Sequence, residues 1–194
     1  KSRSEADRDF LLSKVKDTSM LIINTLNDLT QLLEIQLRHE QPSAVSLFRD
    51  AYENSLQMLD EEYKTAAPVI DVRFEVNEVL FPKAYLDSIL YNLLSNAIKY
   101  RQKDKTPVIF IGTRSMDGHV VLTVKDNGIG IDMQRHGHDI FKYKKVFHKG
   151  YNSNGVGLFL TRSQVEAGNG RIEVESAVNE GTEFRVYLWK NNLL

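Results

Sequence analysis

The feature that most limits the fold of this chain is the order of its apolar periodicities after Pro68. Residues 69–75 alternate like a half-buried strand, and residues 83–101 carry an apolar stripe at helical spacing. Residues 107–115 and 119–125 predict two strands, residues 155–167 a helix, and residues 171–178 and 182–189 a final hairpin. This order predicts an α/β (α+β) fold, a two-layer sandwich in which a mixed sheet carries its helices on one face.

The first 40 residues form a separate pattern. Residues 4–39 contain neither proline nor glycine and predict one long helix. Its apolar seam consists of Leu12, Val15, Ile22, Leu26, Leu29 and Leu33. A helix of this length spans about 50 Å, which is longer than such a domain needs. We therefore expect the seam to pack against another helix, in this chain or in a second subunit.

A second helix is predicted to follow the break at Gln41–Pro42. Ser43 is a candidate N-cap for a helix that runs to about Tyr63. The residues expected to face inward are Val45, Phe48, Ala51, Leu56 and Leu59. We accordingly divide the chain into residues 1–40, a partial helical element, and residues 41–194, a mixed α/β domain.

Composition excludes several classes of function. The chain has no cysteine, which rules out disulfides, thiolate metal sites and cysteine nucleophiles. Its net charge of −1 gives no bulk attraction to nucleic acid, so we expect no nucleic-acid partner. No apolar run reaches the roughly 18 residues that a membrane span requires. We expect a cytoplasmic fragment whose only route to a membrane is through segments upstream of Lys1.

A polar stripe marks the helix predicted over residues 83–101. Asn92, Asn96 and Lys99 are spaced i, i+4 and i+7 and share one face, opposite leucine, alanine and isoleucine. Such a stripe faces either water or a polar ligand. An amide oxygen is a suitable ligand for Mg²⁺, and a lysine can meet a phosphate.

Two glycine-rich stretches complete the candidate site. DNGIGID, residues 126–132, begins with an aspartate that can accept a hydrogen bond from an exocyclic amine. GVGLFL, residues 155–160, runs into a helix N-terminus, where backbone amides favour phosphate. Each stretch alone is also typical of an ordinary turn. The phosphate-binding pattern GxxxxGK[ST] is absent.

The combination resembles the sensor histidine kinases of two-component signalling, in the GHKL ATPase superfamily shared with gyrase B, Hsp90 and MutL. NLLSNAIKY, DNGIGID and GVGLFL are similar to the N, G1 and G2 boxes of that family, DIFKYKKVF to its F box, and NEGTEF to its closing strand turn. The resemblance implies the Bergerat ATPase fold and a kinase that transfers the γ-phosphoryl group of ATP to a histidine, for relay to a response regulator.

The resemblance also implies residue roles. Asn96 would hold Mg²⁺, while Asn92 and Lys99 would lie along the phosphates with Tyr100 close by. Asp126 would bind the adenine amine, Gly128 and Gly130 would shape the floor, and Thr182 would bind adenine through water. The hinge and amide cradle would be Gly155, Gly157 and Leu158. Residues 133–154 would form an ATP lid, anchored by Phe141 and Phe147, with candidate γ-phosphate contacts at Lys142, Lys144 and Lys145. Asn92, Lys99 and Lys145 are thus the catalytic candidates.

No phosphoacceptor motif of the type H-[ED]-L-[RK]-x-P occurs in the chain. His39 stands at a helix end and lacks the L-[RK] step, so we expect the acceptor to lie before Lys1 and this fragment not to phosphorylate itself. Residues 10–37 resemble the second helix of the family's dimerisation hairpin, which implies a bacterial parent that forms a homodimer through this helix. The alternatives are a gyrase- or Hsp90-like clamp and an anti-sigma serine kinase.

Overall fold

The computed structural model describes residues 7–16, 18–19, 22–23, 26, 30, 44–145 and 155–190. The chain divides into two compact units, Lys1–Arg38 and His39–Leu194. The described residues of the first unit are helical, as predicted, and its seam residues Leu12, Val15, Ile22 and Leu26 are each more than half exposed. Leu29, Leu33 and His39 lie outside the described residues. No described helix combines the length and hydropathy of a membrane span.

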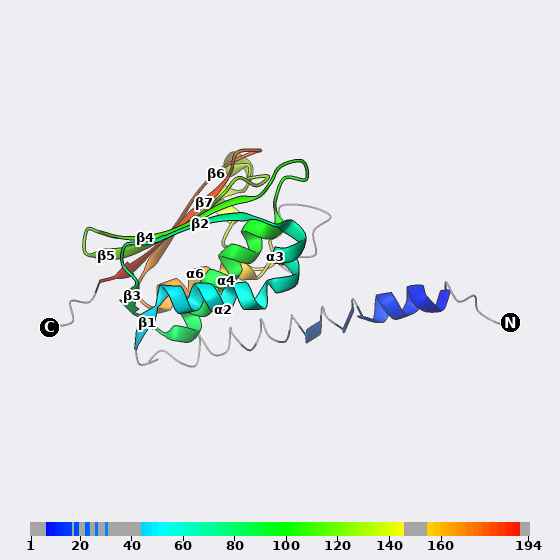
Figure 1. The fold of residues 1–194 in the computed structure, drawn as a ribbon, viewed down its shortest axis with the longest axis horizontal. Coiled ribbons are helices and arrows are strands. Elements are labelled where there is room, and N and C mark those ends of the chain that lie inside the picture. The colour runs from blue at the N-terminus through cyan, green and yellow to red at the C-terminus, as the bar shows by residue number, and fades with distance from the viewer. Residues whose placement is uncertain are drawn as a thin grey trace. The chain divides into compact units, whose positions relative to one another are not determined.

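Five strands form the central sheet of the second unit, in the order β2-β4-β5-β7-β6 (Figure 1). The strands are β2 (Val69–Phe74), β4 (Val108–Met116), β5 (His119–Asp126), β6 (Arg171–Ala177) and β7 (Gly181–Trp189). β2 pairs with β4 in parallel, and the other neighbours are antiparallel. The predicted mixed sheet is therefore confirmed.

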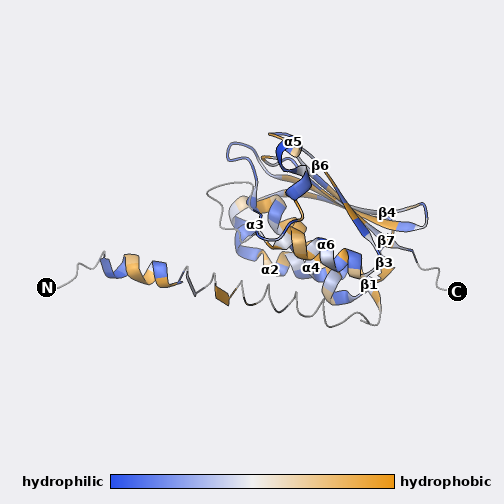
Figure 2. Ribbon diagram, turned by 180° about the vertical axis from the view of Figure 1, so that it is seen from behind, coloured by the Kyte–Doolittle hydropathy of each residue, from blue (hydrophilic) through white to orange (hydrophobic). Residues whose placement is uncertain are grey.

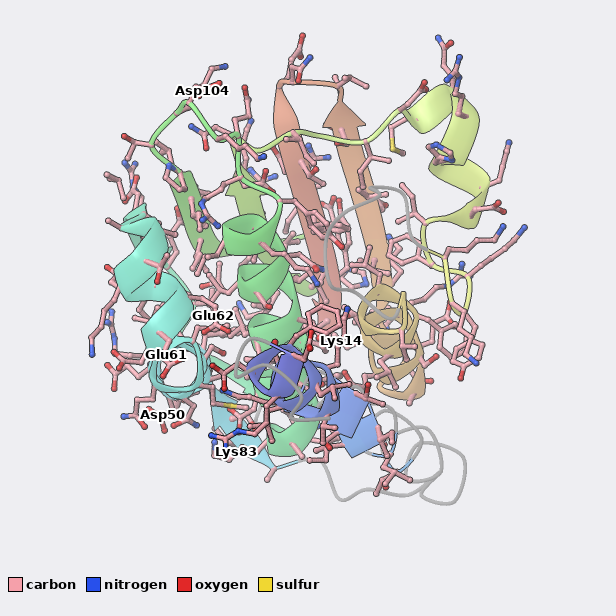
Figure 3. All side chains as sticks on the ribbon, turned by 90° about the vertical axis from the view of Figure 1, so that its right-hand side faces the viewer. Lys14, Asp50, Glu61, Glu62, Lys83 and Asp104 are labelled. Atoms are coloured by element: carbon pink, nitrogen blue, oxygen red, sulfur yellow. The ribbon has the colours of Figure 1, made fainter. Side chains whose placement is uncertain are left out.

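The helices cover one face of this sheet (Figure 1), which confirms the two-layer arrangement. They are α2 (Phe48–Met58), α3 (Asp60–Ala66), α4 (Lys83–Lys99) and α6 (Gly157–Ala167). α4 packs against α2 and α6, and Figure 3 shows it in green between them. α4 is thus held on both sides, which fixes the direction of its polar stripe.

The core lies between the helices and the sheet. Strand alternation puts Val120, Leu122 and Val124 of β5 on the helix-facing side, where all three are buried. Leu90, Leu93 and Leu94 of α4 are buried as well. Figure 2 shows hydrophobic and hydrophilic residues mixed along the helices that cover the sheet. Each apolar side chain of the core contributes about 1.5–3 kcal/mol when fully buried, so this layer anchors α4 firmly.

The helix predicted from Ser43 to Tyr63 is wrong in two places. Residues Val45–Leu47 form strand β1, which pairs antiparallel with β3 (Glu78–Leu80), a strand that was not predicted. The buried Ser46 hydroxyl donates to the Phe81 carbonyl oxygen at 2.7 Å, so this buried polar group is satisfied in the extended pairing. Val45 therefore points outward, about half exposed, instead of into the core.

The same predicted helix is also interrupted at Leu59, where the backbone leaves helical geometry between α2 and α3. Leu59 is nevertheless buried, as are Phe48 and Ala51, so the inward face was predicted correctly at these three positions. Leu56 is half-buried. Three-residue strands such as β1 and β3 are too short to show a period, which is why the pattern favoured a helix.

Candidate nucleotide-binding site

The polar stripe on α4 is the first part of the candidate site. Asn92, Asn96 and Lys99 are half-buried on one side of the helix, while Leu93, Ala97 and Ile98 on the other side are buried. Burial lowers the pKa of the Lys99 ammonium. A half-buried cation and two amides on one face form a surface that suits an anionic, oxygen-rich ligand.

Asp126 at the end of β5 is the second part. Its carboxylate accepts hydrogen bonds from the Gly128 backbone N–H, at 2.7 Å, and from the Thr182 backbone N–H. Burial raises the pKa of the Asp126 carboxyl to about 6, and the two N–H donors act in the opposite direction. The carboxylate is therefore fixed in position and keeps lone pairs that can accept from a ligand.

The backbone of the DNGIGID loop passes close to the end of α4. The Ile129 N–H donates to the Tyr100 carbonyl oxygen at 2.9 Å. A Cβ at Gly128 would lie 2.5 Å from that oxygen and 2.7 Å from Asp126 Oδ1, so only glycine fits. Gly130, at φ +64°, continues this loop beside Ala177. The loop thus joins the Asp126 end of β5 to Tyr100, one residue beyond Lys99.

A glutamine that the sequence analysis missed holds this loop. Gln102 Nε2 donates to the carbonyl oxygens of Asn127 and Gly128, at 2.9 and 3.0 Å, and to that of Asn179 at 3.0 Å. Gln102 thereby ties the end of α4, the DNGIGID loop and the β6–β7 turn together. No sequence signal marked it, because its partners are backbone atoms that meet only in the folded domain.

The start of β7 contributes Thr182, which is buried and pairs with Ser176 of β6. Ser176 Oγ lies 2.9 Å from Thr182 Oγ1, and it also accepts from the Ile131 N–H and donates to the Gly181 carbonyl oxygen. Ser176 was missed as well. A signal existed, because strand alternation puts it on the apolar face of β6 with Ile172 and Val174.

The GVGLFL segment meets the polar stripe of α4. A Cβ at Gly157 would lie 3.1 Å from Asn92 Oδ1, so the start of α6 and the Asn92 side chain are near neighbours. No side chain caps α6, which leaves the amides of its first turn, including those of Gly157 and Leu158, without an intrahelical acceptor. Uncapped amides beside Asn92 suit an anion.

The predicted lid is described up to Lys145 and contains two short helical turns, α5 (Met133–His136) and η1 (Gly137–Asp139). Phe141 lies under the Arg162 guanidinium of α6, with the Arg162 carbon 5.8 Å from the ring centroid. Tyr143 packs edge-on against Phe159, also of α6, at 5.6 Å between centroids. The described part of the lid therefore rests on α6. Phe147 lies outside the described residues.

Asp139 binds two of the three predicted phosphate-contacting lysines. It forms ion pairs with Lys142 and with Lys145, the latter at 3.0 Å. These contacts, with the Lys142 hydrogen bond the largest, lower the pKa of the Asp139 carboxyl to about 2. A Cβ at Gly155 would lie 2.5 Å from the Lys145 carbonyl oxygen, so Lys145 also lies next to the start of the GVGLFL segment.

The residues of the site suit a magnesium ion that is held mainly by the phosphates of a bound nucleotide and by water, with few protein ligands. Among the described residues no group of three or more histidine, aspartate or glutamate side chains is arranged to hold a metal. Mg²⁺ commonly keeps several waters and takes one or two protein oxygens together with substrate phosphates. A single amide oxygen at Asn96 is compatible with that mode of binding.

The sequence matches a family described as histidine kinase-, DNA gyrase B-, and HSP90-like ATPase over residues 83–192. It is 27% identical over 201 residues to the circadian input-output histidine kinase CikA of Synechococcus elongatus. The matched region covers 98% of this chain and 26% of CikA. It is 26% identical over 190 residues to the sensor protein kinase WalK of Staphylococcus saprophyticus, covering 91% of this chain and 30% of WalK. The chain thus spans about a quarter to a third of these relatives.

A solved structure has the same fold. The histidine kinase AdeS of Acinetobacter baumannii superposes with a TM-score of 0.72 at 20% identity, over 99% of this chain and 88% of the AdeS chain.

Proposed function

The chain belongs to the histidine kinase-, DNA gyrase B-, and HSP90-like ATPase family and carries the catalytic domain of a sensor histidine kinase, and from this premise we propose that it binds ATP with Mg²⁺ for phosphoryl transfer to a histidine. The observation that carries the proposal is the position of the Asp126 carboxylate, which accepts from the backbone amides of Gly128 and Thr182. Gln102 joins the loop that follows Asp126 to the end of α4. An acceptor held in this way recognises an exocyclic amine.

The nucleotide would lie between the β5–β7 end of the sheet and the N-terminus of α6. Asp126 accepts from the adenine amine, Gly128 and Gly130 line the base, and Thr182 lies beside it. The phosphates extend along Asn92, Lys99 and Tyr100 toward the amides of Gly157 and Leu158, with Gly155 as the hinge. The contact between Gly157 and Asn92 supports this path, because it joins the two phosphate-binding segments.

Phosphoryl transfer requires position and charge neutralisation more than covalent chemistry by the protein. Asn92 and Lys99 orient the phosphates, and Lys145 contacts the γ-phosphate from the lid, which Phe141 anchors against α6. Asn96 would hold a Mg²⁺ ion, which would supply positive charge to offset the charge that develops on the phosphate oxygens. The acceptor is a histidine outside this chain, and a response regulator aspartate receives the phosphoryl group next. The helical unit would pair the parent protein as a homodimer.

Calorimetric titration with a non-hydrolysable ATP analogue tests the proposal. Asp126→Asn replaces one acceptor oxygen by a donor, so its dissociation constant should rise at least about tenfold. Asn96→Ala should remove the effect of Mg²⁺ on affinity. Asp50→Asn is the matched control, because Asp50 projects from α2 into solvent (Figure 3). Equal affinity of wild type and Asp126→Asn would refute the base-binding role.

A further inference from the structure

Ser176 has three polar neighbours, and together they determine the direction of one proton. The Ile131 N–H donates to Ser176 Oγ at 2.8 Å, and Ser176 Oγ donates to the Gly181 carbonyl oxygen at 2.8 Å. The third neighbour is Thr182 Oγ1, at 2.9 Å. A serine hydroxyl carries one proton, and a carbonyl oxygen carries none. With the Ser176 proton on the Gly181 carbonyl oxygen, the Thr182 hydroxyl is left as the donor to Ser176.

This direction limits what Thr182 can offer to a ligand. With its only proton on Ser176 Oγ, the Thr182 hydroxyl has lone pairs left and no donor. The backbone N–H of the same residue donates to the Asp126 carboxylate, so that carboxylate lies beside the Thr182 backbone. An ionised carboxylate is also an acceptor without a proton. Asp126 and Thr182 thus present acceptors only to the bound base.

We propose that Ser176 is a positioning residue that sets base specificity by holding the Thr182 hydroxyl as an acceptor. The inference rests on the proposed function, since it concerns the base of the nucleotide bound at Asp126. A purine with a 6-amino group offers the donor that these acceptors require. A purine with a 6-oxo group brings an acceptor to the same place and leaves buried acceptors facing each other, which is costly.

The pair ATP and inosine triphosphate isolates this effect, because their bases differ in the hydrogen-bonding pattern at positions 6 and 1 while the ribose and phosphates are identical. The quantity to measure is the ratio of their dissociation constants with Mg²⁺, by calorimetry. In Ser176→Ala the Thr182 hydroxyl is free to rotate and donate to a 6-oxo group. The ratio of the inosine triphosphate constant to the ATP constant should fall on the order of tenfold.

Two further variants separate this role from a merely structural one. Ser176→Thr keeps a hydroxyl with the same partners and should restore the wild-type ratio. In a Thr182→Val background, which has no hydroxyl to direct, adding Ser176→Ala should leave the ratio within about twofold. A loosened loop would weaken both nucleotides alike, so an equal loss of both in Ser176→Ala would overturn the inference.

The test remains decisive if Ser176→Ala does not fold. Thr182→Val should then lower the ratio, while Thr182→Ser, which keeps the hydroxyl, should preserve it. Identical ratios in these two variants would overturn the inference. If the wild-type chain binds neither nucleotide, the proposed function fails, and the inference fails with it. If the wild-type chain binds ATP and only the ratio is insensitive, the proposed function stands.

Discussion

Asp126 is a carboxylate whose chemistry departs strongly from that of a solvent-exposed side chain. Burial raises the pKa of its carboxyl from 3.8 to about 6, although two backbone amides favour the charged form. Keeping this carboxylate charged at the base site in neutral solution therefore lowers the stability of the folded domain. Such a shift is typical of functional positions, and it follows from burial that the sequence pattern alone does not reveal.

This shift gives a prediction for stability. Because the folded-state pKa of Asp126 lies above its unfolded value, the folded chain binds more protons between these two pH values. The free energy of unfolding should therefore fall as pH rises from about 4 to about 6, by about 2–3 kcal/mol for this group. Asp126→Asn removes this titration while the other carboxylates remain.

The check is urea unfolding of wild type and Asp126→Asn at about pH 4.5 and about pH 7.5. Wild type should lose stability relative to the variant at the higher pH. A difference between the two proteins that stays constant with pH would contradict the raised pKa.

At the level of elements, the long patterned segments could be predicted and the short ones could not. β2, α4, β4, β5, α6, β6 and β7 all lie where their periodicities indicated, within a few residues. β1 and β3 have three residues each, and a buried Ser46 whose partner lies 35 residues away cannot be recognised from local pattern. Likewise, motif residues such as Asp126 could be predicted, whereas Gln102 binds backbone atoms of distant loops that no local pattern reveals.

The three hydrogen bonds of Gln102, the Gln102 clamp, connect the end of α4, the DNGIGID loop and the β6–β7 turn. Substitutions at Gln102 should therefore affect both nucleotide binding and stability. Gln102→Ala removes the donors, whereas Gln102→Glu also brings a carboxylate against three carbonyl oxygens. The Glu variant should therefore bind the ATP analogue more weakly than the Ala variant. Its free energy of unfolding should be about 2 kcal/mol lower than that of wild type.

Gln57→Glu is the control for added charge, since Gln57 is exposed on α2. Calorimetry and urea unfolding supply the two readouts. If Gln102→Glu behaved like Gln57→Glu, or no worse than Gln102→Ala, the clamp would have no role in holding the base loop.

The whole molecule consists of two units with different surfaces. The α/β unit has a buried apolar core, whereas the described part of the helical unit leaves a series of large apolar side chains exposed. Exposed apolar stripes of this kind are typical of helix–helix interfaces. We predict that the chain self-associates through the helical unit, as the homodimer proposed for the parent requires.

Light scattering on the full chain checks this prediction. Wild type should show a concentration-dependent apparent mass of at least about twice that of the monomer. Val15→Glu combined with Ile22→Glu should shift it to monomer, because charges within the stripe oppose burial. Met58→Glu, at an exposed apolar residue of α2, should have no effect. A wild-type monomer at high concentration would contradict the prediction.

In the proposed site, the DNGIGID loop and the start of α6 bind the same nucleotide. Amide hydrogen exchange of the full chain, with and without Mg²⁺ and a non-hydrolysable ATP analogue, tests it directly. The nucleotide should slow exchange at Gly128–Ile131 and at Gly157–Phe159 together, while β2 and β3 are unaffected. Protection of only one of the two segments, or of neither while the nucleotide is bound, would show that they do not belong to one site.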